Sequence, residues 1–376
     1  MSTKLKIAAA VAAAVLLSAC SSPKHEPMPL VNFTPSMEVT EVWSKGLSSA
    51  EGFLVPAVYD DMVFAAGGKT LTRLNARTGE TEWSVSFDSP ITGGVGSDGY
   101  VTAVGLWDGN LEVVDAEGKV SWEKKLTTEL ASPPVVSHGL VIARTMDTRV
   151  SAFEASSGEL QWTYQKSQPA LTVRLPTRML AHDNFLLVGQ PNGHIVILDI
   201  ASGKPVFEFQ VAQAKGVTEV ERLVDVVGAP AFSENLVCAA AFQGAVTCVD
   251  STNGQTKWTQ KIDAVAGPAI DEDNVYAVSV NGEVQAFYRE SGEQRWSNKT
   301  MLYRGLSAPV VLRLRPFLSG SECRQFSGYV HFLSPRTGEE MARVRLSGPI
   351  VTQAQPFSAG AIFQTSKGEV AYLSNR

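Results

Sequence analysis

Apolar residues alternate with polar or small residues in short runs along most of the chain, and each run turns back at a glycine or asparagine. Clear cases are segments 185–199, 236–250 and 274–288, which read FLLVGQPNGHIVILD, LVCAAAFQGAVTCVD and NVYAVSVNGEVQAFY. A period of two is typical of half-buried β-strands, and Gly or Asn at the tip tolerates the positive φ of a hairpin turn. The pattern therefore predicts a series of β-hairpins.

A short phrase such as DSTNGQTKW (250–258) follows seven of these hairpins and gives the chain an internal repeat. Its glycine recurs at positions 79, 118, 158, 203, 254, 292 and 338, so the intervals are 39, 40, 45, 51, 38 and 46 residues. This period is typical of propeller blades, whereas helical solenoids repeat every ~34 residues. An apolar segment that contains Pro, such as SPPVV (132–136), precedes several hairpins and predicts a further strand. Proline, which lacks a backbone N–H, is tolerated at the first residue of a strand. Each unit therefore predicts four strands.

Eight such hairpins can be counted, and the eighth (361–376) reaches the C-terminus without a closing phrase. The segment EVTEVWSKGL (38–47) carries the Trp of a closing phrase but has no hairpin before it. We therefore expect an all-β, eight-bladed β-propeller of four-stranded antiparallel blades, spanning residues 38–376. Its ring would be closed by the N-terminal strand joining the C-terminal blade, which removes free sheet edges.

Six of the seven tryptophans stand at or near the end of the repeated phrase, and packing between neighbouring blades explains such regular recurrence better than a ring of ligand-stacking aromatics. We expect these side chains to dock one blade on the next: Trp43, Trp83, Trp122, Trp162, Trp258 and Trp296.

The first 19 residues predict a signal peptide rather than part of the fold. Two lysines precede a ten-residue apolar run (7–16), which is shorter than the roughly twenty residues a membrane span needs. The run ends in Leu-Ser-Ala-Cys, which resembles the lipobox of bacterial lipoproteins, so we expect Cys20 to be acylated, for example with palmitate. Residues 20–37 contain four prolines and predict a flexible, extended tether that holds the body about 50 Å from the membrane.

Charge and cysteine content narrow the classes of partner. The formal net charge of −6 becomes −8 once Lys4 and Lys6 are removed with the signal peptide. The chain has no run of Lys and Arg, so we expect no nucleic-acid partner. Besides Cys20, the chain has three cysteines. Cys238 and Cys248 flank one hairpin turn and could form a disulfide, although the residues favour two buried reduced thiols.

Motifs for catalysis are weak. GVGSDG (94–99) fits a dinucleotide fingerprint by letter, but no helix follows it, and the five histidines lack metal-ligand spacing. The repeated phrase resembles the blade motif of pyrroloquinoline-quinone (PQQ) dehydrogenases, which are longer chains and often carry an adjacent cysteine pair that is absent here. We therefore expect no enzyme activity, cofactor, metal site or catalytic residue, with a quinoprotein dehydrogenase as the alternative.

Two longer intervals between phrases mark a candidate binding surface. The extra length falls near 165–180 and 208–228, in neighbouring loops that mix apolar residues with charged ones. Adjacent insertions on one rim are a common partner site in propellers, although two solvated turns would have the same composition.

The lipobox, the PQQ-like repeats and the segment TEVERLVDV (218–226) together resemble the BamB family, lipoproteins of the outer-membrane β-barrel assembly (BAM) machinery. The resemblance covers the whole chain. In that family the two loops contact the periplasmic domains of the BamA barrel protein. The family's two loop patterns fall on 171–174 and 222–227, with Val227 in place of an aspartate. The partner-binding residues that the resemblance implies are Leu171, Val173, Arg174, Arg222 and Asp225.

The resemblance implies a non-catalytic scaffold, lipid-anchored on the periplasmic face of the outer membrane, that assists insertion of barrel proteins. Unfolded barrel precursors would be further partners, and a periplasmic propeller with another protein partner remains an alternative. Segment 312–326, with Cys323, shows no clean alternation and is either a loop peculiar to this chain or a local sequence error.

Overall fold

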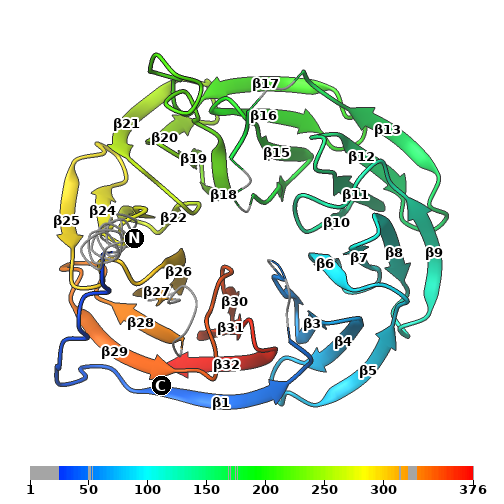
Figure 1. Cartoon of the computed structure of the whole chain (residues 1–376), viewed down its shortest axis with the longest axis horizontal. Coiled ribbons are helices and arrows are strands. Elements are labelled where there is room, and N and C mark those ends of the chain that lie inside the picture. Colours follow the sequence, from blue (N-terminus) through cyan, green and yellow to red (C-terminus); the bar gives the residue numbers. More distant parts are fainter. Residues whose placement is uncertain are drawn as a thin grey trace, which may run out of the picture.

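The computed structural model describes residues 25–49, 52, 54–167, 169, 171–173, 175, 177–312, 315–320 and 328–375. Within these residues all regular structure is β, and the strands form eight four-stranded antiparallel sheets arranged around a central axis (Figure 1). The predicted all-β propeller of four-stranded antiparallel blades is therefore confirmed. No helix of the described part is long and apolar enough to cross a membrane.

Each blade takes its first strand nearest the axis and its fourth at the outer edge (Figure 1). Blades 1 to 4 comprise β2 (Ala57–Tyr59), β3 (Met62–Gly67), β4 (Thr70–Asn75) and β5 (Thr81–Ser86); β6 (Ile91–Ser97), β7 (Thr102–Leu106), β8 (Asn110–Val114) and β9 (Val120–Lys125); β10 (Val135–Ser137), β11 (Leu140–Arg144), β12 (Val150–Glu154) and β13 (Leu160–Tyr164); β14 (Leu180–His182), β15 (Phe185–Gly189), β16 (His194–Asp199) and β17 (Pro205–Gln210).

Blades 5 to 8 comprise β18 (Val226–Ser233), β19 (Leu236–Ala241), β20 (Gly244–Asp250) and β21 (Thr256–Ile262); β22 (Ala269–Ile270), β23 (Asn274–Val278), β24 (Val284–Tyr288) and β25 (Gln294–Asn298); β26 (Leu306–Leu312), β27 (Arg315–Gly320), β28 (Tyr329–Leu333) and β29 (Glu340–Arg345); β30 (Gln355–Phe357), β31 (Gly360–Gln364), β32 (Glu369–Asn375) and β1 (Val39–Gly46).

The eighth sheet joins the two ends of the described chain. β1 is hydrogen-bonded to β32 in antiparallel register, from Val39 opposite Asn375 to Gly46 opposite Glu369. The N-terminal strand thus occupies the outer position that the fourth strand takes in every other blade (Figure 1).

At six of the junctions between blades, a tryptophan packs on the glycine of the repeated phrase in the next blade. The glycine of the phrase has positive φ, and a Cβ added to Gly158 would lie 2.7 Å from the ring of Trp122 in the preceding blade. The indole Nε1 of that tryptophan donates to the carbonyl of Ala155, which begins the same turn, at 2.8 Å. The same indole-to-carbonyl bond is made by Trp43, Trp83, Trp162, Trp258 and Trp296.

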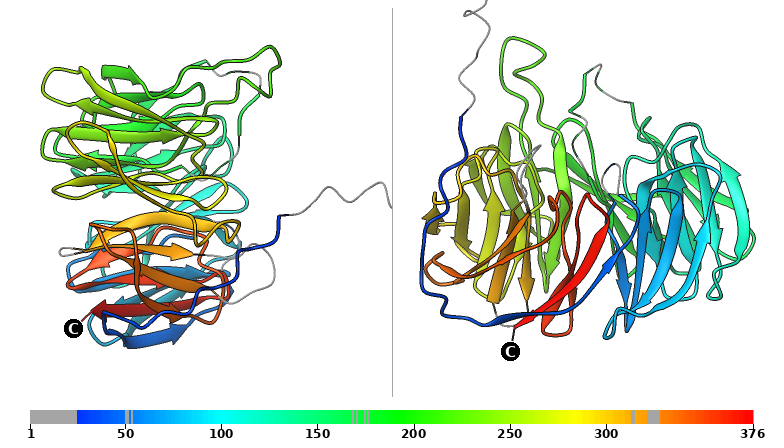
Figure 2. Two further views of the ribbon diagram at one scale, coloured as in Figure 1. Left: turned by 90° about the vertical axis from the view of Figure 1, so that its left-hand side faces the viewer. Right: turned by 60° about the horizontal axis from the view of Figure 1, so that its bottom comes forward.

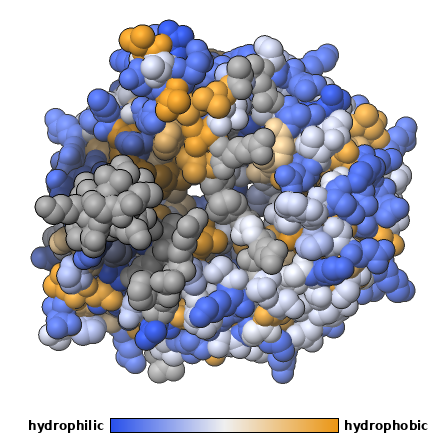
Figure 3. Space-filling view, viewed as in Figure 1, coloured by the Kyte–Doolittle hydropathy of each residue, from blue (hydrophilic) through white to orange (hydrophobic). Residues whose placement is uncertain are grey.

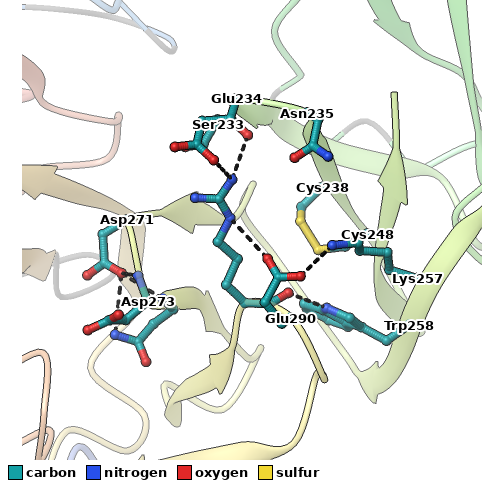
Figure 4. A network of polar contacts seen from close by, with 12 residues as sticks. Ser233, Glu234, Asn235, Cys238, Cys248, Lys257, Trp258, Asp271, Asp273 and Glu290 are labelled. Carbon is teal, nitrogen blue, oxygen red and sulfur yellow. Dashed lines mark hydrogen bonds and ion pairs between the residues drawn. A yellow bond between two sulfur atoms is a disulfide. The ribbon is translucent and has the colours of Figure 1, made fainter. Parts of the chain in front are cut away.

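The prediction of two reduced thiols in blade 5 is wrong. Cys238 and Cys248 lie directly opposite each other on β19 and β20, with Cα atoms 4.1 Å apart, and form a disulfide. Both are fully buried beside Trp258, in the cluster that joins blades 5 and 6 (Figure 4). A directly opposite pair in an antiparallel hairpin already has the short Cα separation that a disulfide needs.

Two further segments bear on the sequence predictions. Residues 25–37, predicted to be a flexible tether, instead lie against the body and hydrogen-bond to it. Within 312–326, β27 pairs with β26 and β28 as the second strand of blade 7, while residues 313, 314 and 321–326, with Cys323, lie outside the described part.

Candidate partner-binding site

The two long loops predicted from the phrase intervals are connectors between successive blades. Loop 1 (residues 165–179) runs from β13 to β14, and loop 2 (residues 211–225) runs from β17 to β18. Strands alternate in direction within a blade. The connectors between blades and the turns between the second and third strands of each blade therefore lie on the same face of the ring, which is called the loop face here. Loop 2 projects from this face (Figure 2), which is the face turned toward the viewer in Figures 1 and 3.

The loops are bonded to each other at their bases. The carboxylate of Asp225 in loop 2 accepts hydrogen bonds from the backbone N–H of Val173 in loop 1 and from that of Asn192, the latter at 3.4 Å. Further along, the N–H of Arg178 donates to the carbonyl of Gly228 at 3.0 Å, beside a parallel bridge between Thr177 and Gly228. The two connectors therefore form one surface rather than two independent turns.

Asp225 was predicted to be a charged partner contact, but the structure buries it. Its side chain is 6% exposed, and its own carbonyl accepts from the N–H of Phe242 at 2.9 Å. Burial raises the pKa of Asp225, while the bonds from Val173 and Asn192 and the charge of Arg144 act in the opposite direction. The carboxylate is thus committed to fixing loop 1 on loop 2, and Asp225 acts as a positioning residue.

The tip of loop 2 is organised by its own side chains. Glu221 accepts hydrogen bonds from the N–H groups of Val217 and Thr218 at 2.8 and 3.1 Å, and these bonds lower its pKa. Arg222 donates through Nε to the carbonyl of Gly216 at 3.1 Å, and its Nη1 lies 3.9 Å from Oε1 of Glu219. The charged residues of the loop therefore shape the turn as well as facing solvent.

The turn presents apolar side chains to solvent. Val217 is 91% exposed and Val220 is 60% exposed, and Leu171 of loop 1 is 43% exposed. Figure 3 shows hydrophobic side chains gathered near this edge of the loop face. Exposed apolar side chains on an ordered protrusion mark an interaction surface more specifically than scattered surface residues do.

The remaining predicted residues are placed as follows. Val173 is half-buried, the side chain of Arg222 is 53% exposed, and Arg174 and Cys20 lie outside the described residues. The sequence reasoning did not include the exposed Val217 and Val220 among the candidate contacts because it weighed the charged residues of loop 2 more heavily. Their interleaving with charges in GVTEVERLV (216–224) is the signal that could have found them.

Loop 1 also reaches across the central axis. Arg178 donates through Nη1 to the side-chain oxygen of Gln353 in the connector to blade 8, at 3.4 Å, and Gln353 donates to the carbonyl of Pro309 in blade 7 at 3.2 Å. These bonds tie the base of the candidate site to the far side of the ring. Within the described residues, no group of three or more His, Cys, Asp or Glu side chains is arranged to hold a metal ion.

Comparison with known proteins places this architecture in a family. The family model for the outer membrane protein assembly factor BamB matches residues 67–298. The BamB of Bordetella pertussis is 33% identical over 336 residues, covering 87% of this chain and 86% of that protein. The BamB of Burkholderia pseudomallei is 38% identical over 256 residues, covering 66% and 67%. The crystal structure of BamB from Moraxella catarrhalis superposes with a TM-score of 0.82 at 27% identity, covering 90% of this chain and all of that one.

Proposed function

This chain belongs to the BamB family of outer membrane protein assembly factors, and we propose that it is a non-catalytic scaffold that binds the periplasmic domains of a BamA-like barrel protein. By doing so it would assist assembly and insertion of β-barrel proteins into the outer membrane. Its relatives carry the name of assembly factors rather than of enzymes, which supports the non-catalytic assignment.

The observation that carries the proposal is the joined pair of loops. Asp225 bonds loop 2 to the backbone of loop 1 at Val173, and the result is an ordered protrusion tipped by Val217 and Val220. The exposed apolar tip marks an interaction surface, and the adjacent exposed Arg222 is a residue type that is enriched in protein-contact hot spots. Preorganisation by the buried carboxylate lowers the entropy that binding would otherwise cost.

The ring and the anchor fit the same role. We infer an eight-bladed ring closed by the β1–β32 pairing, supported by the eight four-stranded sheets of the described part. Acylation of Cys20 would keep this ring on the periplasmic face of the outer membrane, where confinement raises the effective concentration of loops and partner. An individually weak contact is then sufficient.

The test is an affinity measurement between the purified protein and the isolated periplasmic domains of the cognate BamA-type protein. We expect Val217→Asp, combined with Arg222→Glu, to weaken binding by at least tenfold, because the first change puts a charge on the apolar tip and the second reverses the charge of the adjacent arginine. Tyr100→Asp is the matched control, since Tyr100 is 73% exposed on the opposite face. Equal affinity for the parent and the loop variant would refute the two-loop site.

Two alternatives have distinct outcomes. A quinoprotein dehydrogenase would bind PQQ and reduce a dye in the presence of an alcohol or sugar. A periplasmic propeller with a different protein partner would bind no BamA-type domain at all, even as the parent protein.

A further inference from the structure

Residues 25–37 form a strap that lies along the outside of blade 7 (Figure 2). At the N-terminal end of the strap, the N–H of Met28 donates to the carbonyl of Leu302 at 3.0 Å, and Arg304 donates through Nη1 to the carbonyl of Met28 at 2.6 Å. The ring of His25 stacks on Tyr303 with centroids 4.4 Å apart and planes 9° from parallel. Four prolines in residues 20–37 predicted an unattached tether, but the structure attaches most of it.

The C-terminal half of the strap follows the outer strand β29 of blade 7. The N–H groups of Ser36 and Met37 both donate to the carbonyl of Met341, at 2.9 and 3.3 Å. Arg343 donates through Nη2 to the carbonyl of Val31 at 3.0 Å, and its guanidinium lies 5.1 Å from the ring centroid of Phe33. The strap thus occupies part of an edge that would otherwise offer unpaired backbone groups.

The arginine that receives the strap is held in place from inside blade 7. Glu340 accepts from Nε of Arg343 at 2.8 Å and is hydrogen-bonded to Nδ1 of His331, which is 1% exposed, at 2.6 Å. A planar guanidinium oriented by a partly buried carboxylate loses little further entropy when it binds the strap. The docking site is therefore built into the blade.

Docking fixes the side of the ring on which the chain's N-terminal part begins. Leu302 and Tyr303 belong to the connector from β25 to β26, so His25 lies on the loop face. Only four residues lie between Cys20 and His25, so the chain takes five residue steps from one to the other. A fully extended chain of that length spans at most about 17 Å, compared with the roughly 50 Å of an unattached extended tether.

The loop face also carries large apolar side chains that are well exposed. Trp107 lies in the turn between β7 and β8, in blade 2, and is 66% exposed; the other six tryptophans stand at blade junctions. Tryptophan favours the interfacial region of a membrane. Outside the two partner loops, Val280 (45%) and Val351 (37%) are further exposed apolar residues of this face.

We propose that the docked strap turns the loop face, with Trp107, toward the lipid surface that holds the acylated Cys20. This inference rests on the lipid anchor of the proposed function. Its occupant is the bilayer itself, because the short chain between Cys20 and His25 leaves the far face no comparable approach. Partner loops and membrane would then lie on the same side of the ring.

The experiment measures energy transfer from the acylated full-length protein to a headgroup-labelled acceptor lipid in phosphatidylethanolamine–phosphatidylglycerol vesicles. A donor dye is attached to Trp107→Cys or, as the matched position in the same blade, Tyr100→Cys in the turn between β6 and β7 on the far face. Cys323→Ser makes the label unique. Blade strands of five or six residues separate the faces by about 20 Å, which such transfer resolves.

A second variant separates the strap from the anchor. Residues 25–36 are replaced by a Gly-Ser sequence of equal length, which removes the strap's side chains and prolines but leaves the propeller untouched. We expect transfer from position 107 to exceed transfer from position 100 at least twofold in the strapped protein, and this ratio to fall toward one in the Gly-Ser variant. Circular dichroism checks that the variant is folded.

Equal transfer from both faces of the strapped protein, or an unchanged ratio in the Gly-Ser variant, would overturn the inference. Vesicle flotation that persists in Cys20→Ala would remove the lipid anchor on which it rests. No barrel protein is present in these vesicles. Failure of the orientation is therefore distinguishable from failure of the partner site, which the affinity measurement tests separately.

Discussion

Truncating the tryptophan between blades 5 and 6 should destabilise the protein far more than truncating an exposed one. Trp258 is 7% exposed, and its Nε1 donates to the carbonyl of Arg289 at 2.8 Å. Its ring faces Gly292 so closely that a Cβ on that glycine would lie 2.5 Å from it. Ion pairs and hydrogen bonds that cross the same junction surround it (Figure 4). The substitution that removes these contacts is Trp258→Ala.

The magnitude follows from what the substitution removes. Large aromatic-to-alanine changes in a packed core cost about 3–5 kcal/mol, because the transfer free energy is lost and a cavity remains. The carbonyl of Arg289 also loses its donor, which adds roughly 1 kcal/mol. The disulfide beside it limits how far blade 5 can collapse into the space. We expect a total loss of about 5 kcal/mol.

The assay is urea unfolding of the purified protein, followed by far-ultraviolet circular dichroism at 25 °C. Trp107→Ala is the matched control, because Trp107 is 66% exposed, and its free energy of unfolding should change by less than about 0.5 kcal/mol. Trp258→Phe should recover much of the packing, as Phe207 does opposite Gly254 in the junction between blades 4 and 5. A loss below about 1 kcal/mol for Trp258→Ala, or an equal loss for Trp107→Ala, would refute the docking role.

Three further substitutions test the packing and electrostatics of the blades. Burial and the facing Glu123 raise the pKa of Glu112 from 4.5 to about 7. The contribution of Glu112 to the stability of the fold is therefore full below pH 4.5 and is lost as the pH rises through 7. Measured by urea unfolding, Glu112→Gln should stabilise the protein by up to about 3 kcal/mol at pH 8 and by little at pH 4. A melting temperature lower than the parent's is expected for Gly158→Ala, because its φ of +71° is strained for alanine and its Cβ would meet Trp122; an unchanged value would contradict this. Phe207→Trp should add the indole hydrogen bond that this junction lacks and raise stability by about 1 kcal/mol, and a drop in urea midpoint would argue against it.

The repeat made the blades predictable because it is local. Alternation with a period of two and a glycine at each turn are written within about 40 residues, and each predicts a strand or turn without reference to distant segments. The tryptophans follow the same logic, since their partner glycine stands in the next copy of the phrase.

Long-range contacts explain what the sequence did not predict. Asp225 reads as a surface charge until its partner Val173, 52 residues away, is known. The strap reads as an unattached tether because its receptors Arg304 and Arg343 lie 276 and 312 residues from the carbonyls they bind. The hairpin pattern brought Cys238 and Cys248 near each other, but only the register shows that they are directly opposite.

The central claim is that the joined loops bind a BamA-type protein, and site-specific photo-crosslinking in living cells tests it most directly. A photoreactive residue in place of Val217 should yield an adduct with the outer-membrane barrel protein, whereas the same residue in place of Tyr100, on the far face, should not. No adduct from position 217, or an equal adduct from position 100, would contradict the account.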